Sequence, residues 1–354
     1  MNSISVCMIV KDEEKSLPDC LNCVKGFADE LIVVDTGSTD RTKEIALSYT
    51  DKVYDFEWRD DFSAARNFSF SKATCDYIMW LDADDMILQD DVMKIWDFKL
   101  SKPSDIDVLM LKYVTSHENF KPLFSFYRER ILRRLSHFTW QDPVHEIIVP
   151  RGKIAHMDIS VYHCKKKAPA SGRNLKIYQN FIERGNTLSP RQQFYYAREL
   201  YFNNYVDQAI HEFSKFLSSH KGWVENNIEA CLNLSRCYQA KNDYESALTA
   251  LFGSFAMAKP RGEILCEIGS IYSKMKRFDE AIYWFKLAKG QKPNYKTGAF
   301  VIEDCYNFLP NLELSVCYFY MGKKGIARRY HQKAKRIHPE HPSVIFNEKF
   351  FQSK

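Results

Sequence analysis

The stretch YIMWLDADD at residues 77–85 decides the fold expected for the N-terminal part of this 354-residue chain. Its first five residues are largely apolar, as in a strand that is covered on both faces within a parallel sheet. Three carboxylates then follow at the end of the strand, at Asp82, Asp84 and Asp85. Such a cluster either caps the next helix as a solvated loop or holds a divalent cation, because hard cations take oxygen ligands and bridge phosphate oxygens.

The residues that precede this stretch alternate between strand-like and helix-like segments. We expect strands at 3–10, 30–34, 52–56 and 76–81, and helices at 13–24, 39–48 and 61–72. Alternation of this kind predicts a parallel sheet with helices on its faces. Ligands bind such sheets outside the carboxyl ends of the strands, which is where the acidic cluster lies.

Three further segments, at 106–114, 123–134 and 153–162, have strand-like patterns separated by turn residues. We interpret them as the second half of the same domain, which would bind the second substrate, the acceptor of any group that is transferred. The segment KKKAPASG at 165–172 is typical of a linker. The N-terminal domain is therefore expected to cover residues 1–170.

Acidic residues also follow the first two strands. Asp12 and Glu13 come after the first strand, and Asp35 ends the second. Carboxylates can accept hydrogen bonds from the ribose hydroxyls and the base of a nucleotide. Because the carboxyl ends of parallel strands meet at one edge of the sheet, these residues and the 82–85 cluster predict a single binding site.

Four segments closely resemble, in order, the motifs of family 2 glycosyltransferases: IVKDEE at 9–14, VDTGSTDRT at 34–42, DFSAARN at 61–67 and WLDADD at 80–85. The chain is most similar to a bacterial branch with tetratricopeptide repeats behind the catalytic domain, some members of which attach sugar to cysteine or serine of bacteriocin-like peptides. The resemblance implies the α/β GT-A fold, which is Rossmann-like with a mostly parallel sheet. It also implies a nucleotide-sugar donor, a divalent metal (Mg²⁺ or Mn²⁺) and inversion at the anomeric carbon.

The resemblance further implies roles for individual residues. Asp84 would bind the metal, together with Asp82 and His163. The residues implied in donor binding are Val10, Asp12, Glu13, Asp35, Arg66, Asn67, Asp82 and Ala83. Two positions depart from the family pattern, since Asp12 stands where Asn is usual and Asp85 where Glu is usual. A single histidine such as His163 is more often structural than a ligand, so both interpretations stay open.

The segment WQDPVHE at 140–146 resembles the part of this branch that faces the acceptor. An inverting transfer needs a carboxylate there to take the proton of the acceptor. We predict Glu146 as this base, Asp142 as the second candidate and His145 as the residue that orients the acid. The alternative for Glu146 is an ion pair with one of three arginines: Arg130, Arg133 or Arg134.

From about residue 174 the sequence is continuously helix-like and contains a repeat. Alanines recur with spacings of 38, 34 and 46, at Ala209, Ala247, Ala281 and Ala327. A spacing of 34 is the tetratricopeptide period. We therefore expect an all-α tetratricopeptide-like domain over 171–354, with equivalent inter-helix turns at 241–244 and 276–279.

Composition and charge exclude several protein classes. Apolar residues make up 45% and charged residues 27%, which suits a folded globular protein. No apolar run approaches the roughly 20 residues that cross a bilayer. The N-terminus lacks the basic patch and cleavage site of a signal peptide, which favours the cytoplasm. The first hundred residues contain 11 Lys and Arg against 21 Asp and Glu, as suits a cation site. No basic-aromatic motif indicates nucleic-acid binding.

Three functions remain open from the sequence. The first is transfer of a hexose, with UDP-glucose as the expected donor, to a cysteine or serine of a peptide or protein, because helical repeats present concave surfaces suited to peptides. The second is a transferase that builds a cell-surface saccharide. The third is a repeat-based peptide-binding protein without catalysis. The helical tail could also form a homodimer, since repeat arrays end in faces that need capping.

Overall fold

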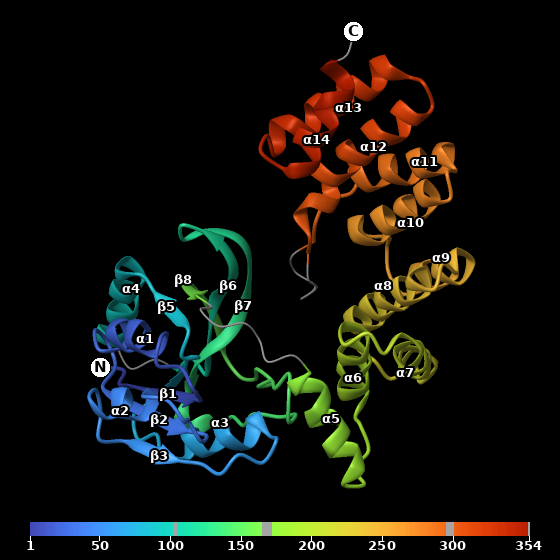
Figure 1. Cartoon of the computed structure of the whole chain (residues 1–354). Coiled ribbons are helices and arrows are strands. Elements are labelled where there is room, and N and C mark those ends of the chain that lie inside the picture. The colour runs from blue at the N-terminus through green and yellow to red at the C-terminus, as the bar shows by residue number, and fades with distance from the viewer. Residues whose placement is uncertain (102–104, 165–171, 295–300, 353–354) are drawn as a thin grey trace. The chain divides into compact units, whose positions relative to one another are not determined.

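The computed structural model describes residues 1–101, 105–164, 172–294 and 301–352. The chain divides into two compact units, Met1–Gly185 and Asn186–Lys354. The first unit is built around a sheet, and the second consists of helices (Figure 1).

The first unit contains an eight-stranded sheet in the order β3-β2-β1-β4-β7-β6-β8-β5. Its strands are β1 (Ile4–Val10), β2 (Glu30–Asp35), β3 (Val53–Asp55), β4 (Tyr77–Trp80), β5 (Asp85–Ile87), β6 (Val108–Glu118), β7 (Lys121–Arg133) and β8 (Ile154–His163). β1 pairs in parallel with β2 and β4, and β2 with β3. β7 is antiparallel to β4 and β6, β6 is parallel to β8, and β5 is antiparallel to β8 at the edge. The predicted α/β architecture with a mostly parallel sheet is confirmed.

Helices cover both faces of this sheet. They are α1 (Leu17–Val24), α2 (Thr42–Leu47), α3 (Phe62–Ser71) and α4 (Gln89–Leu100); the unit also contains a 3-10 turn, η1 (Arg134–Ser136), and a further helix, α5 (Arg173–Glu183). Val6 and Met8 of β1 pack in one apolar cluster with residues of α1 and α4, whereas Cys7 packs with Phe70 of α3 in another. Because successive side chains of a strand point to opposite faces, both faces need apolar residues, which explains the continuous apolar run of β1.

Two elements of the first unit, β5 and α4, were not predicted. The acidic stretch at 82–85 is only in part a loop, because Asp85 begins β5 and pairs with β8. A strand of three residues is too short to show a periodic pattern in the sequence. This strand brings the acidic cluster into contact with a segment almost eighty positions further along the chain.

The first unit continues through α5. The Tyr178 hydroxyl donates to the Val144 carbonyl at 3.4 Å, and the Asn180 amide donates to the Asp60 carboxylate at 2.8 Å. These contacts hold α5 against the sheet domain, and the unit ends at Gly185. Residues 165–171, which form most of the linker expected from the sequence, lie outside the described residues.

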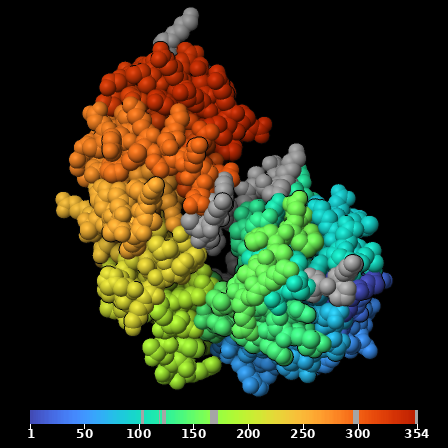
Figure 2. Space-filling view, turned by 180° about the vertical axis from the view of Figure 1, so that it is seen from behind, coloured from blue at the N-terminus to red at the C-terminus, as the bar shows by residue number. Residues whose placement is uncertain are grey.

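The second unit consists of antiparallel helix pairs that follow one another in sequence and in space (Figures 1 and 2). Its helices are α6 (Pro190–Phe202), α7 (Val206–Ser218), α8 (Val224–Ala240), α9 (Tyr244–Gly253), α10 (Gly262–Lys274), α11 (Phe278–Lys289), α12 (Phe308–Tyr320), α13 (Lys324–Ile337) and α14 (Pro342–Gln352), with short turns η2 (Ser254–Ala256) and η4 (Glu303–Tyr306). Figure 2 shows their surfaces as successive bands of colour from yellow to red. Within the described residues, none of the helices combines the length and apolar character that crossing a bilayer requires.

The helical repeat predicted from the alanines is confirmed. All four alanines are completely buried. Five positions before each of them the chain turns through a left-handed residue, and these residues are Asn204, Asn242, Lys276 and Gly322. They repeat with the same spacings of 38, 34 and 46 as the alanines. The helix pairs α6/α7, α8/α9, α10/α11 and α12/α13 are therefore copies of one unit, in which both the helices and the connections between pairs vary in length.

Candidate active site

The second strand ends in a loop that closes around one oxygen of Asp35. Asp35 Oδ1 accepts hydrogen bonds from the backbone N–H groups of Gly37 and Ser38, both at 2.7 Å. Gly37 has a φ of 97°, a left-handed conformation that glycine adopts without steric cost. The other oxygen, Oδ2, is buried and has no hydrogen-bond partner in the described part of the chain. A buried acceptor of this kind calls for a donor, which a ligand hydroxyl or amide can supply.

The end of β1 is tied to the same loop. Val10 is buried and pairs with Asp35 in the register of β1 and β2. Asp12 Oδ1 accepts from the Thr39 backbone N–H at 2.7 Å, and the Glu13 N–H donates to the Thr42 hydroxyl at 2.6 Å. The residues predicted on the donor side at 10–13 therefore lie beside the loop that follows Asp35.

Arg66, on α3, connects the acidic cluster with the loop that follows β7. Its Nη2 donates to Asp82 Oδ1 at 2.8 Å, and its Nε donates to Glu146 Oε1 at 2.9 Å. Its guanidinium carbon lies 5.1 Å from the ring centroid of Trp80 and 4.8 Å from that of Trp140. The side chain is only 9% exposed, so this cation is shielded from water and paired on two sides. Arg66 thereby holds Asp82 and Glu146 on either side of one guanidinium.

The charge of Arg66 controls the protonation of Asp82. Burial alone would raise the pKa of the Asp82 carboxyl, but the cations of Arg66 and Arg130 outweigh burial and lower the pKa to about 2. For the cation of Arg66 burial has the opposite effect and would lower the pKa, but the carboxylates of Asp82 and Glu146 outweigh burial and raise it. Both side chains therefore stay charged at neutral pH, and Asp82 remains a hydrogen-bond acceptor.

Asp85, the last carboxylate of the cluster, has a structural partner. Asp85 and Arg130 form an ion pair at 2.8 Å in which both side chains are completely buried. The Arg130 guanidinium carbon also lies 3.7 Å from the ring centroid of Trp80. Asp85 Oδ2 in turn accepts from the Asp82 backbone N–H at 3.0 Å. This buried pair fixes the turn at 82–85 against β7.

Asp84, Asp85 and His163 form a group that could hold a metal ion. One ligand atom from each side chain lies within 4.8 Å of the others. They meet because Asp85 of β5 is directly opposite His163 of β8 in the antiparallel register. His163 Nδ1 lies 3.2 Å from Asp84 Oδ1, and the carboxylates of Asp84 and Asp85 raise the pKa of His163 to about 10.

The donor atoms of this group fit a divalent cation. Asp85 Oδ1 and His163 Nδ1 are buried, and neither makes a hydrogen bond of ordinary geometry within the described residues. Carboxylate oxygens suit Mg²⁺ and Mn²⁺, and a neutral imidazole can complete the set. The sequence predicted Asp84, Asp82 and His163 as ligands. The structure groups Asp84 and His163 with Asp85, whereas Asp82 pairs with Arg66. Ala83, between the two carboxylates, is buried.

The loop at 140–147 is fixed by side-chain hydrogen bonds at Trp140 and by backbone hydrogen bonds that join its two ends. The Asn67 side chain donates to the Trp140 carbonyl at 3.0 Å and accepts from the Trp140 N–H at 2.8 Å. Gln141 and Ile147 exchange two backbone hydrogen bonds, at 2.9 and 3.0 Å. Asn67 thus positions the loop, and its contact with the donor stays a prediction.

Glu146, the predicted base, forms an ion pair, but not with an arginine that the sequence analysis named. The expected partners were Arg130, Arg133 or Arg134, and the observed partner is Arg66, which lies 80 positions earlier in the chain. Arg66 occupies only Oε1, and Oε2 makes no hydrogen bond to the residues that the structure describes. Glu146 therefore has one oxygen fixed and one available to an acceptor.

Asp142 and His145 lie in the same loop with left-handed backbones, at φ 72° and φ 55°. The Asp142 carbonyl accepts from the Ser63 hydroxyl at 2.5 Å. The His145 ring stacks on Tyr178 with centroids 6.5 Å apart. These contacts show where the two residues are anchored, and their roles towards an acceptor stay predictions.

The cation–π stack beneath this site was not predicted from the sequence. The Trp80 ring is contacted by three arginines, with guanidinium carbons 5.1 Å (Arg66), 5.2 Å (Arg128) and 3.7 Å (Arg130) from its centroid. The segment RERILRR at 128–134 concentrates arginines beside the buried Ile131 and Leu132, and this was the available signal. Arg66 supplies the countercharge of the partly exposed Asp82, and Arg130 supplies the one that lets Asp85 lie completely buried.

Comparison with known proteins assigns the two units to known types. Residues 5–160 match the profile of Glycosyl transferase family 2, and residues 228–251 and 262–295 match a tetratricopeptide-repeat profile. A TPR repeat-containing protein of Synechococcus elongatus is 37% identical over 148 residues, which cover 42% of this chain and 36% of the relative. The SPbeta prophage-derived glycosyltransferase SunS of Bacillus subtilis is 27% identical over 259 residues, which cover 68% of this chain and 60% of SunS.

The chain thus spans between about a third and three fifths of the length of these curated relatives. Among solved structures, MamA from Desulfovibrio magneticus RS-1 aligns with 49% of this chain and 89% of its own at 13% identity. Its TM-score of 0.38 is too low to support an argument.

Proposed function

We propose, from the premise that residues 5–160 form a family 2 glycosyltransferase domain followed by tetratricopeptide repeats, that this protein transfers a hexose from a nucleotide-diphosphate sugar to a peptide or protein side chain. One observation carries this proposal. Asp84, Asp85 and His163 gather their ligand atoms within 4.8 Å at the carboxyl end of β4, the edge at which parallel sheets bind ligands. UDP-glucose is the proposed donor, a cysteine or serine the proposed acceptor, and inversion the proposed stereochemical course.

The donor nucleoside would lie between the ends of β1, β2 and β4. Asp35 Oδ2, buried and without a partner in the described residues, would accept a hydrogen bond from the base or ribose. Val10, Asp12 and Glu13 would form the adjacent wall, because their backbone and side chains already hold the loop beside Asp35. Asp82 and Ala83 would lie towards the ribose and diphosphate.

The metal would be held by Asp84, Asp85 and His163, with Mg²⁺ or Mn²⁺ as the proposed ions. When bound, it supplies Lewis-acid stabilisation of the charge that grows on the leaving diphosphate. His163 must lose its proton to serve as a ligand, and the two carboxylates that now raise its pKa would then coordinate the ion instead. Asp82 keeps its negative charge through Arg66 and so adds to the field that attracts the cation.

Glu146 is the proposed base, with Asp142 as the second candidate and His145 as an orienting residue. The acceptor hydroxyl or thiol would attack the anomeric carbon and pass its proton to Glu146 Oε2, while the bond from that carbon to the diphosphate oxygen breaks. Arg66 holds Oε1 and so fixes the direction in which Oε2 faces. The same guanidinium holds Asp82, which ties the acceptor side to the donor side.

A peptide or protein acceptor is favoured by the repeat unit, because stacked helix pairs present extended surfaces for chain segments. A transferase of cell-surface saccharides would share the donor site and differ in the acceptor. A non-catalytic peptide-binding protein is the remaining alternative. Association into a homodimer through the tail stays a prediction.

Hydrolysis of nucleotide-sugars in the absence of acceptor tests the proposal. With UDP-glucose and Mn²⁺, the full chain should release UDP, and chelation by EDTA should stop this release. Asp84→Asn should lower the rate by about a hundredfold, because one carboxylate of the charge-stabilising group is lost. Asp90→Asn, which removes an exposed carboxylate of α4, is the matched control and should leave the rate unchanged.

Two results would contradict this assignment. Release that is insensitive to both EDTA and Asp84→Asn would exclude the proposed metal group. No release and no metal-dependent binding with UDP-, GDP- or dTDP-sugars would favour the binding protein without catalysis.

A further inference from the structure

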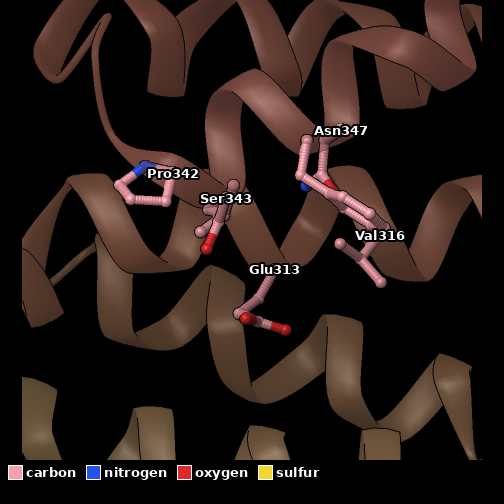
Figure 3. Close-up of a pocket in the computed structure, with 7 residues that line it drawn as sticks. Glu313, Val316, Pro342, Ser343 and Asn347 are labelled. Atoms are coloured by element: carbon pink, nitrogen blue, oxygen red, sulfur yellow. The ribbon is translucent and has the colours of Figure 1, made fainter.

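The second unit has a pocket of about 400 Å³ between α12 and α14 (Figure 3). Its lining residues are Leu312, Glu313 and Val316 from α12, and Pro342, Ser343, Phe346 and Asn347 from α14. Figure 3 shows the labelled α12 side chains facing those of α14 across the pocket. The volume falls within the range of roughly 300 to 1,000 Å³ that is typical of ligand sites.

The pocket combines an apolar wall with one charge. Leu312, Val316 and Phe346 supply hydrocarbon surface, and Ser343 and Asn347 supply hydrogen-bonding groups. Glu313 is the single ionisable side chain among the lining residues. A ligand that matches this lining has a hydrocarbon stem and a positively charged end.

The Glu313 carboxylate is not neutralised by the protein. Its side chain has no hydrogen bond or ion pair with any residue that the structure describes. The cation of Lys274, on α10, attracts it but donates its own hydrogen bond to Gln239 at 2.7 Å. Burial raises the pKa of Glu313, and Lys274 offsets only part of this effect. A carboxylate that is partly shielded from water and has no hydrogen-bond partner is less stable than a paired one, and a cation from another molecule would stabilise it.

We propose that this pocket binds a lysine or arginine side chain of a peptide. The aliphatic stem would pack on Leu312, Val316 and Phe346, as such stems do on apolar surfaces. The charged head would donate to Glu313, and the oxygens of Ser343 and Asn347 would accept its remaining N–H groups. The inference rests on the proposed function in taking the partner to be a peptide, and it adds a chemical requirement for a basic residue in that peptide.

Fluorescence anisotropy with the full chain and two short labelled peptides tests this inference. The peptides are identical except at the central residue, which is lysine in one and norleucine, an uncharged residue with the same stem, in the other. The wild type should bind the lysine peptide about tenfold more tightly, the effect of one charge-assisted hydrogen bond. Glu313→Gln should abolish this preference without changing the affinity for the norleucine peptide.

Glu340→Gln is the matched control, because it removes an exposed carboxylate from the α13–α14 connection, outside the pocket. It should retain the full preference for lysine. Equal binding of both peptides by the wild type, or a preference that survives Glu313→Gln, would overturn the inference. Glu313→Gln should not lower the melting temperature, since it removes an unpaired charge. If it does, Asn347→Leu, on the α14 side, replaces it and should reduce the preference.

Nucleotide-sugar hydrolysis by the same preparations separates this inference from the proposed function. Hydrolysis without a preference for lysine would leave the transferase assignment intact and refute the pocket. A preference for lysine without hydrolysis would support the pocket and refute the transferase assignment.

Discussion

The edge of the sheet that carries Asp82 and Asp85 and the helix pairs of the second unit are stabilised in opposite ways. At the edge, the partly exposed Asp82 and the completely buried Asp85 are stabilised by the countercharges of Arg66 and Arg130, which come from other elements. In the repeats, completely buried small and aromatic residues such as Ala281 and Phe285 pack against apolar neighbours. A buried charge depends on one particular partner, whereas an apolar contact depends mainly on volume. The edge therefore gains a defined geometry and loses tolerance to substitution.

The strongest test of this contrast is Arg130→Met. The substitution leaves the Asp85 carboxylate buried without a countercharge, so the free energy of unfolding should fall by about 4 kcal/mol. Chemical denaturation followed by tryptophan fluorescence measures the change. Arg128→Met is the comparison variant, because Arg128 also lies over Trp80, but its side chain is 24% exposed whereas that of Arg130 is completely buried, so the loss should be smaller. Equal losses in the two variants would refute the special role of the Asp85–Arg130 pair.

Glu30 shows the same dependence on pairing away from the site, and its pH dependence can be predicted. Burial would raise the pKa of Glu30, but Lys52, the Ser5 hydroxyl and Thr74 outweigh it and lower the pKa from 4.5 to about 2. A carboxylate with a depressed pKa stabilises the fold fully above its unfolded pKa. This stabilisation is lost as the pH falls from about 4.5 towards 2.

Glu30→Gln should therefore cost about 3 kcal/mol at pH 7, because Glu30 accepts four hydrogen bonds, one from Ser5, one from Lys52 and two from Thr74. Denaturation at a series of pH values should show the wild-type and variant stabilities converging near pH 2. A constant difference down to that pH would argue that shape, and not charge, explains the loss. Glu44→Gln, at an exposed ion pair with Arg41, is the control and should leave the free energy of unfolding nearly unchanged.

In the repeat unit, the expected effects follow from volume. Gly269 of α10 faces Phe285 of α11, and a Cβ atom at this position would lie 2.8 Å from the phenylalanine ring. Gly269→Ala should therefore destabilise the unit by about 2 kcal/mol through overpacking, as measured by thermal denaturation followed by circular dichroism. Gly253→Ala, where a Cβ would meet no atom within 4 Å, should be neutral or stabilising. The same loss from both alanines would indicate that backbone flexibility, and not the approach of α10 and α11, requires glycine.

The smallest effect is expected at the repeated turns. Lys276 and Asn242 occupy equivalent left-handed positions, each with a φ of 60°. Lysine is strained there and asparagine much less so, so Lys276→Gly should stabilise the unit by about 0.5 kcal/mol and Asn242→Gly should change little. Melting temperatures of the two variants give the comparison, and a gain at Asn242 as large as at Lys276 would contradict this account.

Those parts of the molecule in which apolar or small residues recur at regular spacings could be predicted from the sequence. The strands and helices of the first eighty residues and the four alanines of the repeats all follow short-range patterns. The partners of the buried charges have no such pattern. Arg66 meets Glu146 across 80 positions, and Asp85 meets His163 through a strand of three residues. Which arginine neutralises which acid depends on how a helix, strands and a loop that are distant in sequence pack together, and neither composition nor spacing reports that packing.

The order of strands at the edge also determines when the candidate metal group can exist during synthesis. Asp84 and Asp85 emerge with β5, but His163 is the last residue of β8, 78 positions after Asp85. A nascent chain that has produced only β1 to β5 carries the acidic turn without the imidazole and without Arg130. Domains generally fold as units while they are made. Competence to hold a cation through all three side chains is therefore acquired only when translation has passed the final strand of the sheet.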